Sequence, residues 1–384
     1  MTDTHAAACI SAAQALERAP SDPVEVVVGL DGFVDHIIDV VDTRSSPTDY
    51  QRVPTIAALG QRISAAAGKS ANLELVITTT KIGGNGPIMA NALAAQGTSV
   101  DVVGLLGEGD TVEPVFAELA GRAARVISLG PASVSDALEF DDGKIILGKH
   151  QSLGLVTYDR LVEACGGVEG LRQLLRTPHG IATTNWTMLL GMTDIWKRLA
   201  EEILPGLRED RPWWFIDLAD PAKRTLEDQR AALSSLAEIQ SHANVVLGLN
   251  EAELRQMLNA AGLAWTDDVD TLTAAQHGCA ALREETSLSV VMCHRVQDAA
   301  CAWAGGSVQV DGFFEPRPKI TTGAGDHFNA GFFGAWLRGV DPLSCLLVGG
   351  ATSGSYVRSG ISPTRSDVVE FLRTYHPSDG SADG

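Results

Sequence analysis

The sequence has no run of lysine or arginine that could follow a nucleic-acid backbone. It contains 29 basic and 48 acidic residues, which gives a formal net charge of -19. Domains that bind nucleic acid usually carry a basic patch, because that patch must neutralise phosphates. We therefore expect no DNA or RNA partner.

The sequence also lacks the features of an exported or membrane-bound protein. No uncharged apolar run approaches the roughly 20 residues needed to span a bilayer. The N-terminus has no basic start and carries Asp3 and Glu17, so it is a poor secretory signal. We expect residues 1–23 to be an extension with a short surface helix. We also expect the protein to have no membrane partner and to be cytoplasmic.

Paired cysteines are missing as well. The six cysteines are scattered, with no C-x-x-C pair and no short Cys/His cluster of zinc-site spacing. This pattern favours reduced thiols in a cytoplasmic protein. The cysteines are Cys9, Cys165, Cys279, Cys293, Cys301 and Cys345.

The remaining pattern is that of an α/β protein with a large core. Continuously apolar, β-rich runs alternate with stretches of helical period, and such runs are expected of parallel strands covered on both faces. We predict a doubly wound, mostly parallel sheet sandwiched by helices, in one domain over 24–375. The predicted strands are 24–30, 99–107, 179–186, 213–218, 244–250 and 287–293, and the predicted helices include 111–122, 188–203, 225–240 and 251–262.

Three segments break this alternation. Residues 33–42, 72–82 and 136–150 have the pattern of strands without crossover helices, and "DDGK" within the last is typical of a hairpin turn. We expect insertions at about 33–82 and 136–150 to build a small antiparallel β lid. The tail 376–384 lacks apolar residues, and we expect it to be disordered.

The stretch "TTGAGD" contains the strongest functional motif of the sequence, a glycine turn followed by an acid. Gly323, Ala324 and Gly325 precede Asp326, and an apolar helical pattern follows at once. A glycine turn at a helix start presents backbone N–H groups to an anion such as phosphate. A carboxylate there suits a base that takes a proton from a hydroxyl attacking that phosphate. Alternatively, Asp326 only caps the helix.

A second glycine cluster, "GGNG", also follows a predicted strand and opens a helix. It is not a dinucleotide fingerprint, because Met89 stands where the third glycine of G-x-G-x-x-G belongs. With two amide donors and one acceptor, Asn85 suits the hydroxyls of a polyol held against exposed backbone. We expect Gly83, Gly84 and Asn85 to contact such a substrate.

Two further acids follow the first predicted strand. Asp31 and Asp35 fall where open α/β sheets bind ligands, beyond the carboxyl ends of their strands. They are candidates for accepting hydrogen bonds from sugar hydroxyls. The alternative is a solvated turn.

Asn250 and Glu253 stand three residues apart at a predicted helix start, so both can lie on one face. Oxygen ligands, often reached through water, are what Mg²⁺ prefers. The alternative is a capping box, in which the two side chains only terminate the helix. Of the histidines, we expect His327 to point away from the site, and His294 has no evident partner in the sequence.

Taken together, these motifs resemble the ribokinase-like (PfkB) family of carbohydrate kinases. The similarity rests on "GGNGPIMANALAAQG", "GLNEAE" and "TTGAGDHFNAGF", in that order, and covers roughly 24–375. It implies that Asp326 is the general base and that Gly323 to Gly325 form the anion hole. It also implies substrate contacts from Asp35 and the "GGN" segment, and a magnesium and phosphate role for Asn250 and Glu253.

Two departures from the family pattern affect the nucleotide side. Ile320 stands where relatives usually have an acid that helps to hold a monovalent cation, and isoleucine cannot ligate one. "CHRVQD" replaces the usual Thr-x-Gly turn, so Arg295 is expected to supply a charged contact to the nucleotide, alongside Thr322 and Asn250. Potassium dependence and the choice of phosphoryl donor stay open.

The sequence thus predicts a Mg²⁺- and ATP-dependent kinase that phosphorylates a hydroxyl, favouring a primary one, on a sugar or sugar derivative. A homodimer formed through apolar lid residues such as Ile37, Val40 and Ile146 is a further expectation. One alternative is a nucleoside kinase of the same fold, with Phe33 or Trp186 stacking on the base. Another is a non-catalytic relative that binds sugar or nucleotide and regulates a partner.

Overall fold

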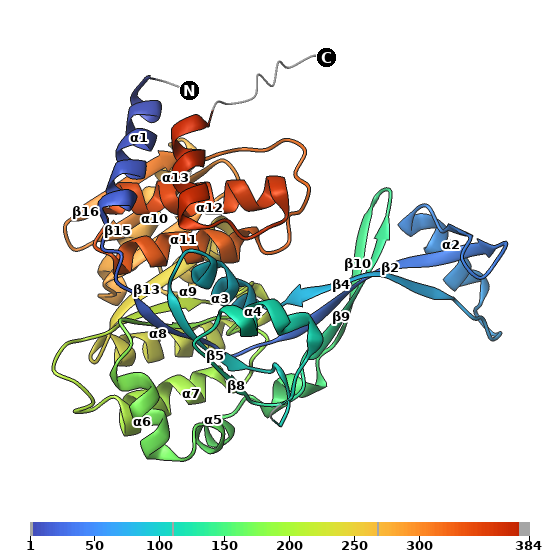
Figure 1. Cartoon of the computed structure of the whole chain (residues 1–384), viewed down its shortest axis with the longest axis horizontal. Coiled ribbons are helices and arrows are strands. Elements are labelled where there is room, and N and C mark those ends of the chain that lie inside the picture. Colours follow the sequence, from blue (N-terminus) through green and yellow to red (C-terminus); the bar gives the residue numbers. More distant parts are fainter. Residues whose placement is uncertain (1–2, 110, 267–268, 376–384) are drawn as a thin grey trace.

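A nine-stranded sheet forms the centre of the computed structural model, which describes residues 3–109, 111–266 and 269–375. Its strand order is β16-β15-β14-β13-β12-β11-β1-β5-β8 (Figure 1). From β8 to β14 neighbouring strands run parallel, and β15 and β16 continue the sheet antiparallel. The strands are β1 (Glu25–Gly29), β5 (Ser99–Gly104), β8 (Arg125–Ser128), β11 (Gly180–Thr183), β12 (Trp213–Asp217), β13 (Asn244–Asn250), β14 (Val290–His294), β15 (Asp298–Trp303) and β16 (Gly306–Asp311).

Helices cover both faces of this sheet, which explains its continuously apolar strands. In β13, Val245 and Leu247 pack into one core while Val246, between them, packs into the other. The first core lies under α5 (Tyr158–Ala164), α6 (Val168–Arg176), α7 (Met192–Arg198), α8 (Leu226–Gln240), α9 (Glu251–Ala260) and α10 (Thr271–Thr286). The second lies under α1 (Asp3–Arg18), α3 (Asn85–Ala95), α4 (Ala117–Arg122), α11 (Ala324–Leu337), α12 (Pro342–Ser359) and α13 (Arg365–Thr374).

The predicted doubly wound sandwich is confirmed, with two local differences. The segment predicted as a helix over 111–122 starts with β7 (Thr111–Val112), which pairs with β6 (Gly107–Glu108). A 3-10 turn at Pro114–Phe116 then precedes α4, because proline favours the first turn of a helix but not its interior. The helix predicted over 188–203 begins later, at Met192, and ends in a π-helical turn over Leu199–Ile203.

A second sheet forms an arm that projects from the body (Figure 1). The arm consists of β2 (Phe33–Arg44), β3 (Tyr50–Arg52), β4 (Leu75–Gly83), β9 (Ser133–Phe140), β10 (Gly143–Lys149) and α2 (Ile56–Ala65). Its strand pairs are antiparallel except for β2 with β9, which run parallel, so the sheet is not purely antiparallel as predicted.

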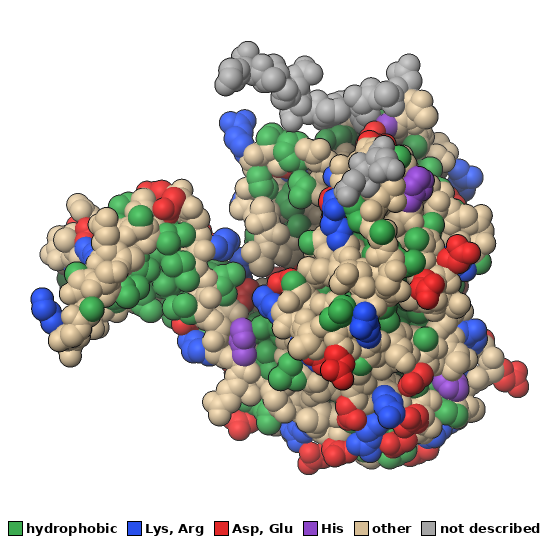
Figure 2. Space-filling view, turned by 180° about the vertical axis from the view of Figure 1, so that it is seen from behind, with side chains coloured by type: hydrophobic (Ala, Val, Ile, Leu, Met, Phe, Trp, Pro, Cys, Tyr) green, Lys and Arg blue, Asp and Glu red, His purple; other side chains and the backbone are tan. Residues whose placement is uncertain are grey.

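The arm has its own small core under α2. That helix begins at Thr55, whose side chain accepts a hydrogen bond from the Ala58 N–H. Seen from behind in Figure 2, apolar side chains also gather on the surface of the arm. The buried core residues are Ile38, Val40, Val53, Leu59, Leu138 and Phe140.

Helix α1 packs against α12 and α13 and buries Ala12, Ala13 and Leu16 in the second core. An ion pair of 2.5 Å between Arg373 and Glu17 ties the N-terminal helix to α13. The predicted N-terminal helix is therefore present and contributes to the core. None of the helices in the described ranges has the length and apolar character needed to cross a membrane. The tail predicted to be disordered, 376–384, lies outside the described residues.

Candidate active site

Polar side chains gather at the carboxyl ends of five neighbouring strands. In an open α/β sheet this edge is where ligands bind. The N-termini of α3 and α11 approach the same place, because the side chain of Asn85 bonds to that of Asp326. The residues at the strand ends are Asp31 after β1, Asn185 after β11, Asp217 in β12, Asn250 in β13 and His294 in β14.

The turn before α11 has the geometry that an anion hole needs. Gly323 has a φ of 87°, in the left-handed region that favours glycine, and a Cβ there would lie 3.2 Å from Ile88. Helix α11 starts at the next residue, Ala324. The N–H groups of a helix's first turn have no carbonyl partner within the helix, and they carry partial positive charge. The turn can therefore bind an anionic group.

Two stacked rings hold the carbonyl groups of this turn. The Tyr356 hydroxyl donates to the Thr322 carbonyl oxygen at 3.1 Å, and Nδ1 of His327 donates to the Gly323 carbonyl oxygen at 2.7 Å. The two rings stack with centroids 3.5 Å apart. Because a carbonyl only accepts, the His327 proton is on Nδ1, and Nε2 accepts from the Ser362 hydroxyl at 2.9 Å.

Burial lowers the pKa of His327 to about 4, so its imidazole is neutral near pH 7. His327 is only 1% exposed, and its bonds confirm that it points away from the site. Its function, like that of Tyr356, is to fix the peptide planes of the turn.

Asp326 lies in the first turn of α11 and is buried. Burial raises its pKa to about 8, and the negative charges of Asp31 and Glu253 act in the same direction. The Asn85 Nδ2 donates to Asp326 Oδ1 at 2.9 Å and opposes this shift. A carboxylate with a pKa near the working pH is suited to take a proton from a hydroxyl.

The second glycine turn is shaped around Asp31. The carboxylate of Asp31 accepts hydrogen bonds from the Asn85 N–H at 3.0 Å, the Gly86 N–H at 2.8 Å and the Asn185 side chain at 2.8 Å. Burial still raises the pKa of Asp31 to about 6. Its observed role is to hold the turn that positions Asn85, and its direct contact with a substrate stays a prediction.

Asp35 reaches the same site from the base of the arm. It pairs across the sheet with Lys81, and a Cβ on Gly83 would lie 2.4 Å from its Oδ1, so only glycine leaves room for the carboxylate. Burial raises the pKa of Asp35, and the Lys81 charge opposes that shift. Burial raises the pKa of Tyr356 to about 12, and the charges of Asp326 and Asp35 act in the same direction, so both carboxylates lie on the side of the Tyr356 hydroxyl.

Asn250 and Glu253 form a capping box at the start of α9. The Asn250 side chain accepts from the Glu253 N–H at 3.0 Å, and Glu253 accepts from the N–H groups of Asn250 and Asp220, each at 2.8 Å. The capping alternative is therefore present. The hydrogen bonds of the capping box leave further lone pairs on both carboxylate oxygens of Glu253. A water-mediated role toward Mg²⁺ therefore stays a prediction.

Asp217, at the carboxyl end of β12, was not among the residues predicted from the sequence. Its Oδ2 accepts from Asn329 Nδ2 at 2.8 Å, while its buried Oδ1 has no hydrogen-bond partner among the described residues. Burial, followed by the charges of Glu253 and Asp326, raises its pKa well above the ordinary value. The sequence signal for Asp217 was its place near the end of the apolar run "WWFIDL", because the carboxyl end of a strand faces the site.

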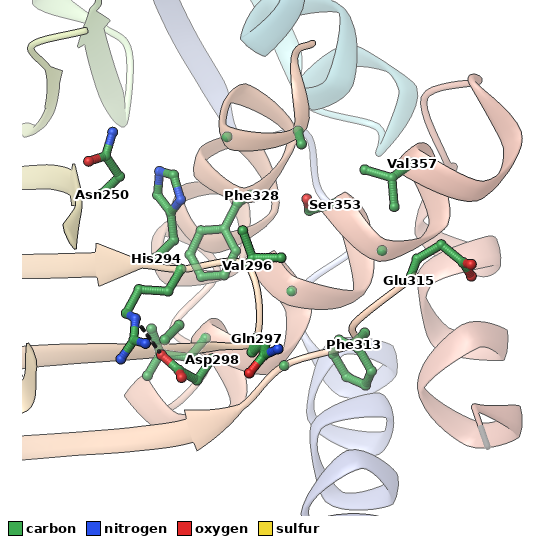
Figure 3. A pocket seen from close by; sticks show the side chains of 18 of the residues that line it. Asn250, His294, Val296, Gln297, Asp298, Phe313, Glu315, Phe328, Ser353 and Val357 are labelled. Atoms are coloured by element: carbon green, nitrogen blue, oxygen red, sulfur yellow. Dashed lines mark ion pairs between the residues drawn. The ribbon is translucent and has the colours of Figure 1, made fainter. Parts of the chain in front are cut away.

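A cavity of about 600 Å³ adjoins the glycine turn (Figure 3). Thr321, Ala324 and Gly325 line it at the turn, and Asn250 lines it at the end of β13. The predicted residue Thr322 is not in the lining. The volume of the cavity suits a small ligand such as a nucleotide. The rest of the wall mixes apolar and polar side chains, including Val296, Gln297, Phe313, Glu315, Phe328, Ser353 and Val357.

Arg295 lines the cavity, as its predicted contact with a nucleotide requires, but its guanidinium is already paired. Its Nε lies 3.0 Å from Glu251 and 3.5 Å from Asp298, and Figure 3 shows an ion pair to Asp298. Two acids therefore hold Arg295 in the wall. Its predicted contact with the nucleotide stays a prediction.

Comparison with known proteins gives a consistent result. The model of the prokaryotic ketohexokinase family matches residues 2–375. A ketohexokinase of Haloferax volcanii is 29% identical over 356 residues, which is 92% of each chain. The ribokinase of Cryptococcus neoformans in complex with ADP superposes with a TM-score of 0.60 at 18% identity, over 92% of this chain and 99% of that one. Phosphofructokinase-2 of Escherichia coli superposes with a TM-score of 0.58 at 14% identity, over 91% of this chain and 98% of that one. These two structures support the fold.

Proposed function

The chain belongs to the prokaryotic ketohexokinase family and is a carbohydrate kinase, and from that premise we propose that it transfers the terminal phosphoryl group of ATP to a hydroxyl of a ketohexose. The observation that carries this proposal is Asp326. A buried carboxylate with its pKa raised to about 8 lies in the first turn of the helix that follows a left-handed glycine turn. That arrangement sets a base beside an anion site, as phosphoryl transfer to an alcohol requires.

In the proposed reaction, Asp326 takes the proton of the attacking hydroxyl. The hydroxyl oxygen forms a bond to the terminal phosphorus of ATP as the bond to the bridging oxygen breaks and ADP leaves. Backbone N–H groups of Gly323 to Gly325 and the start of α11 stabilise the charge on the transferring group. Tyr356 and His327 support this stabilisation, because their hydrogen bonds to the carbonyl oxygens of the turn keep those oxygens directed away from the anion.

The side chains around Asp326 favour a polyol acceptor. Asn85 and Asp35 offer amide and carboxylate groups, which hydrogen-bond hydroxyls well. We expect Gly83 and Gly84 to let the sugar approach the backbone, and the arm to close over it as a lid that excludes water.

A nucleoside acceptor is less well supported. Trp186 is fully buried, its indole N–H donates to Thr193, and the Arg224 guanidinium covers its ring at 4.4 Å. Phe33 is 4% exposed and packs edge-on against His150. These are the two aromatic residues predicted to stack on a base, and because both are buried against protein side chains, neither is placed to do so.

The residues present fit a magnesium ion carried with the nucleotide. Asp217 has a buried oxygen with no hydrogen-bond partner among the described residues. Burial raises its pKa, and the charges of Glu253 and Asp326 raise it further, so a cation nearby would favour its ionised form. In the described part of the chain no three His, Cys, Asp or Glu side chains are close enough to hold a metal directly. We therefore expect Asp217 and Glu253 to reach Mg²⁺ through water, with Asn250 beside them.

When bound, Mg²⁺ neutralises phosphate charge. Asp217→Asn should raise the Mg²⁺ concentration needed for half-maximal activity. An unchanged requirement would remove Asp217 from this role.

We also propose that the arm pairs with the arm of a second copy. Ile77 and Ile146 are 52% and 61% exposed on it, and exposed apolar patches often mark interfaces. Val40, which the sequence analysis included in this surface, is 1% exposed under α2 and belongs to the arm's core instead. Sedimentation should give a dimer that Ile146→Glu weakens, and a monomeric wild type would contradict the proposal.

The substrate is tested by ADP formation from ATP and Mg²⁺ over a panel of ketohexoses, aldohexoses, pentoses and nucleosides. We expect the highest kcat/KM for a ketohexose such as fructose. Phosphorus–carbon coupling in the NMR spectrum of the product should place the phosphate on a primary hydroxyl. Preference for a nucleoside would establish the alternative acceptor instead.

A further inference from the structure

His294 ends β14 and directs its side chain into the cavity beside the glycine turn. In Figure 3 its ring lies between Asn250 and Phe328, and the ring centroids of His294 and Phe328 are 5.2 Å apart. Packing against Phe328 gives the imidazole a defined place. Within the described part of the chain, neither of its ring nitrogens has a hydrogen bond or an ion pair.

The edge of this imidazole lies against the anion hole. A Cβ built on Gly325 would lie 3.1 Å from Cε1 and 3.5 Å from Nε2 of His294. Gly325 is one of the residues whose N–H groups begin α11, so Nε2 faces the space next to those groups. An anion bound by the turn would therefore lie within reach of this nitrogen.

The chemistry of the side chain agrees with its position. Burial lowers the pKa of His294 to about 4, so near pH 7 the ring is neutral and carries one N–H donor. This N–H has no protein acceptor among the described residues, so it is free to donate to a phosphate oxygen bound in the cavity. The next residue, Arg295, directs its Nε to Glu251 and Asp298, whereas its buried Nη1 has no partner among the described residues, so a nucleotide contact from Arg295 stays compatible with this role of His294.

We propose that His294 is a phosphate-binding residue of this enzyme, whose Nε2 donates a hydrogen bond to an oxygen of the nucleotide's β-phosphate, the group that ATP and ADP share. This inference rests on the proposed function, since that function supplies the nucleotide. It assigns the two ends of the cavity: phosphates lie at Gly325 and His294, and the base lies toward Phe313 and Val357. The tautomer with the proton on Nε2 is the one that an anion at the turn selects.

The test compares His294→Leu and His294→Gln with His277→Leu, a matched control at an exposed position of α10. Calorimetric titration of each variant with Mg-ADP and with adenosine separates the phosphate contact from the base contact. A hydrogen bond to a charged group corresponds to roughly a tenfold to hundredfold change in Kd. We expect His294→Leu to weaken ADP binding by that factor and leave adenosine binding unchanged. His294→Gln, which retains a donor, should recover part of the loss, and His277→Leu should behave as wild type.

Two results would overturn the inference: unchanged ADP binding in His294→Leu, or equal loss of ADP and adenosine affinity. Circular dichroism of each variant establishes that it is folded, and the glutamine variant provides a second comparison if the leucine variant is not. The readout is independent of sugar turnover. A protein that loses ADP affinity as expected but phosphorylates no sugar would contradict the proposed function alone. A ketohexose kinase whose His294→Leu variant binds ADP normally would contradict only the inference.

Discussion

The Nδ2 of Asn85 donates to Oδ1 of Asp326 at 2.9 Å, across 241 positions of sequence. This bond joins the N-terminus of α3 to that of α11, and so joins the two glycine turns of the site. Because the same bond lowers the pKa of Asp326 while burial raises it, Asn85 also sets the pH at which the base becomes available.

Replacing Asn85 should therefore move the pH dependence of the reaction. In Asn85→Ala, Asp326 loses a hydrogen bond that favours its ionised form, so its pKa should rise by roughly one unit or more. The inflection of kcat/KM, expected near pH 8 in the wild type, should shift to higher pH. Asn259→Ala, at an exposed position of α9, is the control. An inflection that stays in place in Asn85→Ala would contradict this role.

The raised pKa of Asp326 also predicts an effect on stability. In the unfolded chain this carboxyl ionises near pH 4, whereas in the folded protein it keeps its proton up to about pH 8. The folded state thus binds the extra proton between these values, and its stability falls as pH rises through that range. Asp326→Asn removes the dependence, so its Tm relative to wild type should increase from pH 5 to pH 8. A constant difference in Tm would show that the pKa is not raised.

Much of this site was predictable because its motifs are local in sequence. Asp326 and the turn before it occupy four consecutive positions, and Gly83, Gly84 and Asn85 another three, so the sequence alone indicated which residues would lie together. Their chemical roles, which the family resemblance implies, stay predictions. Asp217 was not predictable in the same way. A single acid at the end of an apolar strand is a common pattern, and the raised pKa of Asp217 depends on its burial and on Glu253 and Asp326, which only the fold brings near it.

The support of the turn can be tested at Tyr356. In Tyr356→Phe the ring can still stack on His327, but the hydrogen bond to the Thr322 carbonyl is lost. A neutral hydrogen bond contributes about 1 kcal/mol, so we expect kcat to fall roughly threefold to tenfold, with the KM for the sugar little changed. Tyr375→Phe removes a hydroxyl whose longer bond, 3.4 Å to the Phe314 carbonyl, lies at the surface, and it is the matched control. Equal kcat values in the two variants would contradict the positioning role.

The contact between Gly83 and Asp35 gives a test of the substrate side. A methyl group at Gly83 would lie 2.4 Å from Asp35 Oδ1, so Gly83→Ala must displace that carboxylate. We expect a rise in KM for the sugar of about tenfold or more, with the KM for ATP nearly unchanged. Gly60→Ala is the control, since a methyl group at Gly60 on α2 meets no atom within 4 Å. Similar kinetic constants in the two variants would remove Asp35 from substrate binding.

The fold was predictable for a different reason. Strands such as β12 and β13 are apolar on both faces, and that pattern specifies a covered parallel sheet wherever it occurs. The proposed role of His294 was not predictable, because no pattern in the sequence indicates that its ring lies against Gly325. Val40 was misassigned to an exposed surface because helix α2, which covers it, was not predicted within the insertion at 33–82.

The most direct test of the central claim is Mg²⁺-dependent formation of ADP from ATP and a ketohexose by wild type and by Asp326→Asn. Because asparagine keeps the shape of the side chain but cannot accept the proton, kcat should fall by about a hundredfold to ten-thousandfold. Binding of ADP and of the sugar should be retained. If Asp326→Asn turns over the sugar at the wild-type rate, Asp326 is not the base and this account of the site is wrong.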